Sequence, residues 1–228
     1  MRLDKYLSNN TEYSRKDVKR ILRADRVRVN GELTRNSALN IPVDADVTLD
    51  ESRIEPLGLG YFMMNKPLGA VCANSDPEHE TVFDLMNEPH DNLHIAGRLD
   101  IDTTGLVLVT GDGKWSHQIT SPRFQCEKSY VAVLSEAITD RMIEKLEQGV
   151  VLQGESQRTA PAKVEKIAED EIRLIITEGR YHQVKRMLAC VGSSVAELHR
   201  ERIGNIQLDP ELQIGEYRAL TTEEITNV

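Results

Sequence analysis

The sequence predicts an α+β protein in two parts: a small basic unit with a linker over residues 1–57, and a mixed, mostly antiparallel domain over residues 58–228. Two observations support this prediction. Short apolar runs typical of buried strands alternate with short segments of helical periodicity, and basic residues concentrate near the N-terminus. A length of 228 residues suits a medium domain with a small one attached.

The charge is unevenly distributed along the chain. The whole sequence carries a formal charge of −9, yet residues 1–35 hold ten Lys and Arg against five Asp and Glu. That segment is therefore +5, which leaves −14 on the rest. Because phosphate binding depends on the local field, a basic arm on an acidic body is compatible with RNA or DNA binding. A solvated helix face is the alternative.

The basic segment contains recognisable local signals. A short helix is expected from Arg2 to about Leu7. Ser14 has the chemistry of a helix N-cap, with Asp17 three residues later, and an apolar stripe follows on an otherwise cationic helix. Alternation over Val27–Val29 before Asn30-Gly31 predicts a hairpin, and Asp46–Leu49 predicts a further strand.

Residues 50–60 lack clear periodicity and contain Pro56, Gly58 and Gly60, which indicates a linker. The larger domain then begins at a candidate buried strand. Its expected strands are Tyr61–Met64, Leu106–Val109, Tyr130–Leu134, Val164–Ile167 and Ile172–Ile176, and its expected helices are Val82–Met86, Asp140–Gln148 and His182–Cys190.

Several classes of protein are disfavoured. The longest clean aliphatic run, Leu106–Val109, is far below the ~20 residues of a membrane helix, and no apolar signal core follows the N-terminus. Three cysteines without CxxC spacing fit a reduced cytoplasm. Neither a metal-binding spacing, a P-loop nor GxGxxG occurs, so we expect no metal, nucleotide or organic cofactor.

The segment Gly97–Leu106 contains the first candidate for catalysis. Asp100 and Asp102 lie beside Arg98 in a turn-rich stretch that leads into a buried strand. The two carboxylates are compatible with an acid/base pair. Alternatively, Asp102 and the threonines after it form a turn, and Asp102 is structural.

A second candidate is Glu178–Met187, where Lys185 and Arg186 begin an expected basic helix. Taken alone, this pattern favours a solvated cationic helix start. Lys66 before Pro67, and Tyr130 after Lys128-Ser129, are unremarkable individually. By itself Tyr130 is best interpreted as a core tyrosine.

Taken in order, these segments resemble the S4-domain-carrying bacterial pseudouridine synthases that modify ribosomal RNA. The resemblance covers nearly the whole chain. The residues of its motifs are most similar to those of members that act on small-subunit (16S) rRNA at uridine 516. Large-subunit relatives tend to carry other residues at the positions of Thr104 and Lys185. It rests on Arg2–Leu7, Ser14-Arg15, Val27–Gly31, Asn65–Gly69, Gly97–Asp100, Thr104–Leu106, Lys128–Tyr130, Gly179–Met187 and Leu198–Arg200.

The resemblance implies roles for individual residues. Asp100 would be the catalytic aspartate, Lys185 its basic partner, and Tyr130 the residue that stacks on the flipped base and lies near its C5. Leu198 would form the apolar wall of the pocket. Candidate contacts with the RNA substrate are Arg98, Lys66, Arg15, Lys19, Arg20, Arg23 and Arg28. A monomer acting on rRNA or on an assembling small subunit, without a cofactor, is expected.

Three other functions remain open from the sequence. A large-subunit rRNA pseudouridine synthase would use the same chemistry. A glycoside hydrolase could use Asp100 and Asp102, but few aromatic residues (4%) are available as sugar platforms and the basic arm has no purpose there. A non-catalytic S4-type RNA-binding assembly factor would not require the motifs of the larger domain.

Overall fold

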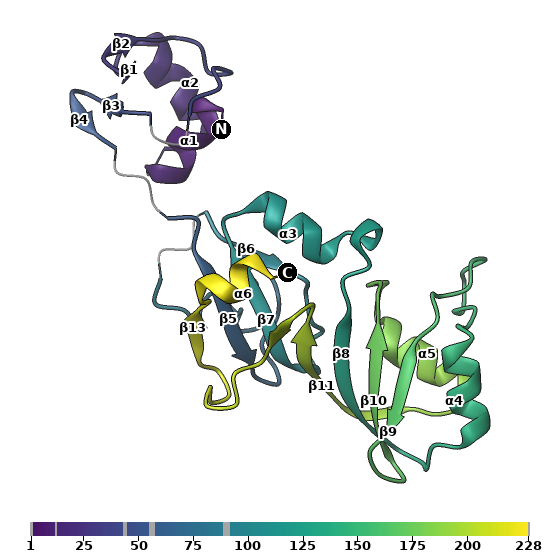
Figure 1. Cartoon of the computed structure of the whole chain (residues 1–228). Coiled ribbons are helices and arrows are strands. Elements are labelled where there is room, and N and C mark those ends of the chain that lie inside the picture. The colour runs from purple at the N-terminus through teal and green to yellow at the C-terminus, as the bar shows by residue number, and fades with distance from the viewer. Residues whose placement is uncertain (1, 12, 43–44, 55–57, 89–91, 228) are drawn as a thin grey trace. The chain divides into compact units, whose positions relative to one another are not determined.

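The computed structural model describes residues 2–11, 13–42, 45–54, 58–88 and 92–227. The chain divides into two compact units, Met1–Leu59 and Gly60–Val228. Both units combine helices with antiparallel strands (Figure 1). The predicted α+β class is therefore confirmed. Among the described residues, no helix is both long enough and apolar enough to cross a membrane.

The first unit packs two helices against a four-stranded antiparallel sheet in the order β2-β1-β3-β4. Its core contains Leu3 and Leu7 from the first helix and Val18 and Leu22 from the second. The elements are α1 (Leu3–Asn10), α2 (Arg15–Arg23), β1 (Val27–Val29), β2 (Glu32–Leu33), β3 (Val47–Leu49) and β4 (Ser52–Arg53).

Helix α2 begins as its sequence predicts. The Ser14 hydroxyl accepts a hydrogen bond from the Asp17 backbone N–H at 3.3 Å, which satisfies one of the free donors of the first turn. The apolar stripe (Val18, Ile21 and Leu22) is buried. The basic side chains of the helix therefore face solvent.

The expected linker over residues 50–60 is partly wrong. Asp50 and Glu51 both adopt positive φ (51° and 65°) and form a tight turn that joins β3 to β4. Ile54 is then buried in the core of the first unit. The hairpin was missed because positive φ normally selects Gly or Asn at such a turn. Residues 55–57, which include Pro56, lie outside the described residues.

The second unit is built on a nine-stranded sheet. Seven strands follow the order β13-β5-β7-β11-β8-β10-β9, while β6 pairs with β7 and β12 with β11. Among the strand pairings that the structure describes in this sheet, that of β7 with β11 is parallel and the others are antiparallel. The strands are β5 (Tyr61–Lys66), β6 (His94–Ala96), β7 (Thr104–Thr110), β8 (Lys128–Leu134), β9 (Lys163–Lys166), β10 (Glu171–Ile176), β11 (Val195–Ile203), β12 (Ile206–Gln207) and β13 (Tyr217–Ala219).

The sheet is apolar on both faces, and each face has its own core. On β7, Leu106 and Leu108 pack with Trp115, whereas Val107 and Val109 belong to the larger cluster that includes Leu188. This alternation follows from the two-residue period of a strand. Helices α4 and α5 lie beside β9 and β10 (Figure 1). The helices are α3 (Gly113–Thr120), α4 (Asp140–Glu147), α5 (Gln183–Val191), α6 (Thr222–Thr226) and the 3-10 turn Pro122–Phe124.

The five strands expected in the larger domain are confirmed, as are the helices expected near residues 140–148 and 182–190. The helix expected over Val82–Met86 is wrong, because this segment forms turns. There the Asp84 carboxylate accepts hydrogen bonds from the backbone N–H and the hydroxyl of Thr81, both at 2.8 Å. Such local bonds compete with helix formation. Val82, Phe83 and Met86 are buried without a helix.

Candidate active site

The loop between β6 and β7 presents the two predicted carboxylates. Leu99 is buried and anchors the loop, while its neighbour Asp100 is half-buried. The Thr103 N–H donates to the Asp100 carbonyl at 3.1 Å, and the Ile101 carbonyl accepts from the Gly69 N–H at 2.9 Å. Backbone bonds from two directions therefore fix where the Asp100 side chain points.

Both oxygens of the Asp100 carboxylate face a potential cation from the start of α5. Lys185 Nζ lies 3.2 Å from Oδ2, and His182 Nε2 lies 3.3 Å from Oδ1. Lys185 also forms a close ion pair with Asp102, whose side chain is 62% exposed. This hydrogen bond from Lys185 holds the pKa of Asp102 below its usual value. A carboxyl group that acts as a general acid needs the opposite change, so Asp102 does not have the environment of a general acid.

The position of α5 depends on the strained residue that precedes it. His182 adopts the left-handed conformation (φ 47°) as the N-cap residue of the helix. The bend directs the His182 and Lys185 side chains to the same carboxylate. Non-glycine residues in this conformation are uncommon and concentrate at functional sites.

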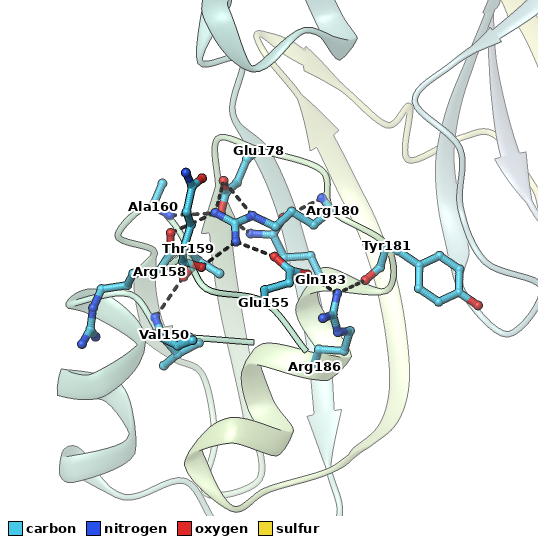
Figure 2. A network of polar contacts seen from close by, with 12 residues as sticks. Val150, Glu155, Arg158, Thr159, Ala160, Glu178, Arg180, Tyr181, Gln183 and Arg186 are labelled. Carbon is cyan, nitrogen blue, oxygen red and sulfur yellow. Dashed lines mark hydrogen bonds and ion pairs between the residues drawn. The ribbon is translucent and has the colours of Figure 1, made fainter. Parts of the chain in front are cut away.

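A polar network braces the chain just before this bend (Figure 2). The Arg180 guanidinium forms ion pairs with Glu155 at 2.7 Å and Glu178 at 3.2 Å, and it also donates to the Gln157 and Arg158 carbonyls at 2.9 Å. These contacts tie the end of β10 to the segment between α4 and β9. Arg180 is therefore structural.

The same network fixes the first turn of α5. The Gln183 side chain accepts from the Arg180 N–H and donates to Glu178, both at 2.8 Å. Arg186 pairs with Glu155 at 2.7 Å and donates to the Tyr181 carbonyl at 3.0 Å. Arg186 is thus held by the protein. The sequence pattern alone favoured a solvated side chain at this position.

The floor of the site is formed by strands β8 and β11. Tyr130 and Leu198 are 9% and 6% exposed, and Arg200 is 2% exposed. Arg200 donates to the Gly97 carbonyl at 2.6 Å and to the Leu106 carbonyl at 2.8 Å, and its guanidinium lies 5.8 Å from the centre of the Tyr130 ring. One buried cation therefore joins the floor to both ends of the Asp100 loop.

A cleft of about 760 Å³ connects these groups. Its lining includes Arg98, Asp100, Tyr130, Lys185 and Leu198, which the sequence separates by up to a hundred residues. In the part of the chain that the structure describes, no group of three or more His, Cys, Asp or Glu side chains is arranged to hold a metal ion. The chemistry offered by the cleft is that of a carboxylate, a neighbouring ammonium and an aromatic ring.

Comparisons with known proteins identify the family. Residues 60–190 match the RNA pseudouridylate synthase family. The chain belongs to this family. It is 51% identical to the ribosomal small subunit pseudouridine synthase A of Yersinia pestis (100% of this chain and 98% of the relative) and to that of Escherichia coli K12 (100% of both). A crystal structure of a pseudouridylate synthase superposes with a TM-score of 0.73 at 41% identity, covering 100% of this chain and 99% of that one.

Lys66, a candidate contact with the RNA substrate, lies inside the synthase unit. Lys66 is 0% exposed, and its ammonium donates to the Thr103 carbonyl at 2.8 Å and to the Pro67 carbonyl at 3.0 Å. Burial also lowers its pKa. This side chain is enclosed and supports the turn that ends the Asp100 loop, and its contact with the substrate stays a prediction.

The other predicted contacts of the synthase are accessible. Arg98 is exposed at the cleft. In the first unit, all five predicted cations are exposed, although Arg20 pairs with Asp17 and Arg28 donates to the Gly31 carbonyl at 3.2 Å. Arg15, Lys19 and Arg23 are spaced four residues apart and share one face of α2.

Sequence reasoning missed His182 and Arg200. None of the six histidines has a metal-ligand spacing, and the contact of His182 with Asp100 joins residues 82 positions apart, so it has no local signal in the sequence. Arg200 lies in β11. The charged residues of this strand mask its hydrophobic pattern in the sequence, although the sheet encloses the strand. A buried arginine within an otherwise polar run is visible only once the neighbouring strands are in place.

Proposed function

We propose that this synthase converts uridine 516 of small-subunit (16S) rRNA to pseudouridine, with Asp100 as the catalytic carboxylate. In this isomerisation the N1–C1′ bond breaks, the detached base turns over, and C5 bonds to C1′. The proton that leaves C5 is balanced by a proton gained at N1. The reaction consumes neither an oxidant nor a reductant.

The observation that best supports this proposal is the ion pair between Asp100 and Lys185, 3.2 Å apart inside the cleft. An adjacent cation favours the ionised carboxylate, and an ionised carboxylate can stabilise or attack a ribosyl centre that develops positive charge. Asp102 also pairs with Lys185, but its side chain is more exposed than that of Asp100. Asp100 is the better placed of the two.

The remaining cleft residues suit a flipped uridine. A stacked base must leave the RNA to reach a pocket, at a cost of a few kcal/mol. The Tyr130 ring supplies a stacking surface near C5, Leu198 an apolar wall, and Arg98 an exposed cation for the opened RNA. Arg200 contacts both the Tyr130 ring and the Asp100 loop, and it holds the two in a fixed position relative to each other.

One observation supports small-subunit rRNA as the substrate, and a second supports RNA binding in general. Relatives that match the full length of this chain at 51% identity are named as synthases of the small ribosomal subunit. The exposed cations of α2 also supply phosphate contacts, which orient RNA with little regard to sequence. Selection of one uridine then depends on RNA shape and unpaired bases. The chain acts as a monomer in this proposal.

The test compares Asp100→Asn with Asp102→Asn. The amide keeps the shape of Asp100 but removes its charge, so we expect turnover to be abolished while RNA affinity stays nearly intact. Asp102→Asn should lose far less activity. The measurement is tritium release from C5-labelled uridine in 16S rRNA, with the modified position mapped afterwards. Equal inactivation of two folded variants would support a pair of catalytic carboxylates instead.

A further inference from the structure

Tyr181 is an exposed aromatic residue at the rim of the cleft. Its side chain is 76% exposed, and its ring stacks on that of His182 with centroids 3.8 Å apart and planes 20° from parallel. Figure 2 shows the Tyr181 ring extending away from the polar network around Arg180. An aromatic ring held at the rim of a binding cleft offers a flat face on which a second π system can stack.

The position of this ring is fixed from below. The Tyr181 carbonyl accepts a hydrogen bond from Arg186 at 3.0 Å, and Arg186 is itself paired with Glu155. Under the ring, His182 is oriented by Asp100, whose Oδ1 lies 3.3 Å from Nε2. Both rings line the cleft. The stacked pair is therefore a preorganised surface attached directly to the site of chemistry.

We propose that the Tyr181–His182 pair is a stacking platform for a nucleobase next to the uridine that enters the cleft. This inference rests on the proposed function. When a uridine flips, its neighbour loses a stacking partner and exposes a face. An aromatic side chain replaces that partner, and such stacking strengthens binding by about 5- to 150-fold per base.

The proposal favours a base over other ligands because of where the ring lies. Asp100, which acts on the flipped nucleoside, is in contact with His182, so the platform lies within one nucleotide step of the reacting uridine. Every base offers a π face, which makes the platform tolerant of sequence. Phe124 provides a contrast: it is also exposed (53%) and packs edge-on against His117, but it does not line the cleft.

The experiment uses the full-length protein and a 16S rRNA oligonucleotide that contains uridine 516. Dissociation constants and single-turnover rates at saturating RNA are measured for wild type, Tyr181→Ala, Tyr181→Trp and the matched control Phe124→Ala. We expect Tyr181→Ala to raise Kd by about 5- to 150-fold, with a smaller change in the saturating rate. Tyr181→Trp should bind at least as tightly as wild type.

A direct contact test accompanies the binding data. The nucleotides on either side of the target are replaced, one at a time, by 5-iodouridine, which cross-links to stacked aromatic residues on irradiation. Cross-linking at one of the two positions should map to Tyr181. A cross-link to Tyr181 from neither position overturns the proposal, as does a Kd for Tyr181→Ala within twofold of that for Phe124→Ala.

Two further outcomes separate this inference from the proposed function. If the saturating rate falls while Kd holds, Tyr181 acts through His182 and Asp100 rather than on RNA, and the platform is wrong. If wild type forms no pseudouridine in the oligonucleotide but Tyr181→Ala still binds it more weakly and the cross-link forms, the proposed target fails while the platform stands.

Discussion

Lys185 contacts two carboxylates at once, and this sharing defines the electrostatics of the cleft. It lies 3.2 Å from Asp100 and forms a closer ion pair with Asp102. Because Asp102 is largely exposed, its half of the arrangement is screened by solvent. The half-buried pair with Asp100 is screened less. The two contacts therefore differ in the electrostatic energy that they contribute, although Lys185 lies closer to Asp102 than to Asp100.

Removing the charge with Lys185→Met should shift the pH dependence of the reaction. The variant takes away the ammonium that lies 3.2 Å from Oδ2 of Asp100, so the carboxylate loses its charged partner in the cleft. The single-turnover rate should fall by about 10- to 100-fold, the value of a hydrogen bond to a charged group, and the size of the loss should vary with pH. The measurement is the rate at saturating RNA across pH.

Two controls accompany this measurement. Lys185→Arg keeps the charge and should retain substantial activity, although the planar guanidinium needs some adjustment. Lys163→Met removes an ammonium that pairs with Glu127 and does not line the cleft. If Lys185→Met weakens only RNA affinity and keeps a normal saturating rate at every pH, Lys185 is a phosphate contact and not the partner of Asp100.

At the level of elements, the parallel pairing of β7 with β11 brings the loop and the floor of the site together. Gly105, at the start of β7, lies opposite Arg200 of β11 and has φ of 98°. A Cβ at this position would stand 2.3 Å from the Arg200 carbonyl oxygen. Only glycine permits this approach, and the same approach places the Arg200 guanidinium against the loop.

Gly105→Ala should therefore destabilise the synthase by about 3 kcal/mol or more, because backbone strain and a steric clash add. Gly154→Ala is a matched control: its φ is 80°, but nothing lies within 4 Å of the added Cβ. This control should cost only about 1 kcal/mol. The measurement is the urea midpoint with its slope. Equal losses in the two variants would show that close approach to β11 is unimportant.

These elements also show how far a sequence alone can be interpreted. The apolar run Leu106–Val109 predicted its strand because burial on both faces produces a continuous hydrophobic signal. Ile172–Ile176 also predicted its strand, and there alternate residues are buried. Strand β11 was missed because charged residues interrupt its apolar ones, and the fold buries Arg200 among them. Helix α3 was missed because it is short and begins with Gly113.

The candidate site was predictable in part. Asp100, Tyr130, Lys185 and Leu198 were named from the resemblance, and the structure places all four in one cleft. The contact of Lys185 with Asp102 depends on side chains 83 residues apart and has no local signal. The burial of Lys66 likewise follows from the strands around it, since the residue type alone suggested an exposed cation.

For the whole molecule, the cations expected to bind RNA and the cleft expected to perform the chemistry lie in separate compact units. The cations of α2 lie in the unit Met1–Leu59, whereas the cleft lies in Gly60–Val228. Each unit has its own hydrophobic clusters. Binding and chemistry are therefore expected to respond separately to substitution.

Replacing Arg15, Lys19 and Arg23 by Gln should lower RNA affinity and reduce its salt dependence. Each lost phosphate contact lowers the slope of log K against log salt by about 0.7–0.9, so three contacts account for about 2. The rate at saturating RNA should change little. Replacing the exposed Arg141, Lys145 and Lys166 of the second unit by Gln alters net charge equally and controls for the general field. An unchanged slope in the α2 variant would show that this face does not touch RNA.

The long-range bonds of Arg200 also bear on the order in which the protein matures during translation. Its partners Gly97 and Leu106 precede it by 103 and 94 residues. A ribosome that has released only the first 190 residues has exposed Asp100, Tyr130 and Lys185, but not the strand that joins them. Because contacts so distant in sequence form late, a nascent chain is expected to be inert until β11 has emerged. Competence therefore depends on a strand that leaves the ribosome after every residue expected to take part in the chemistry.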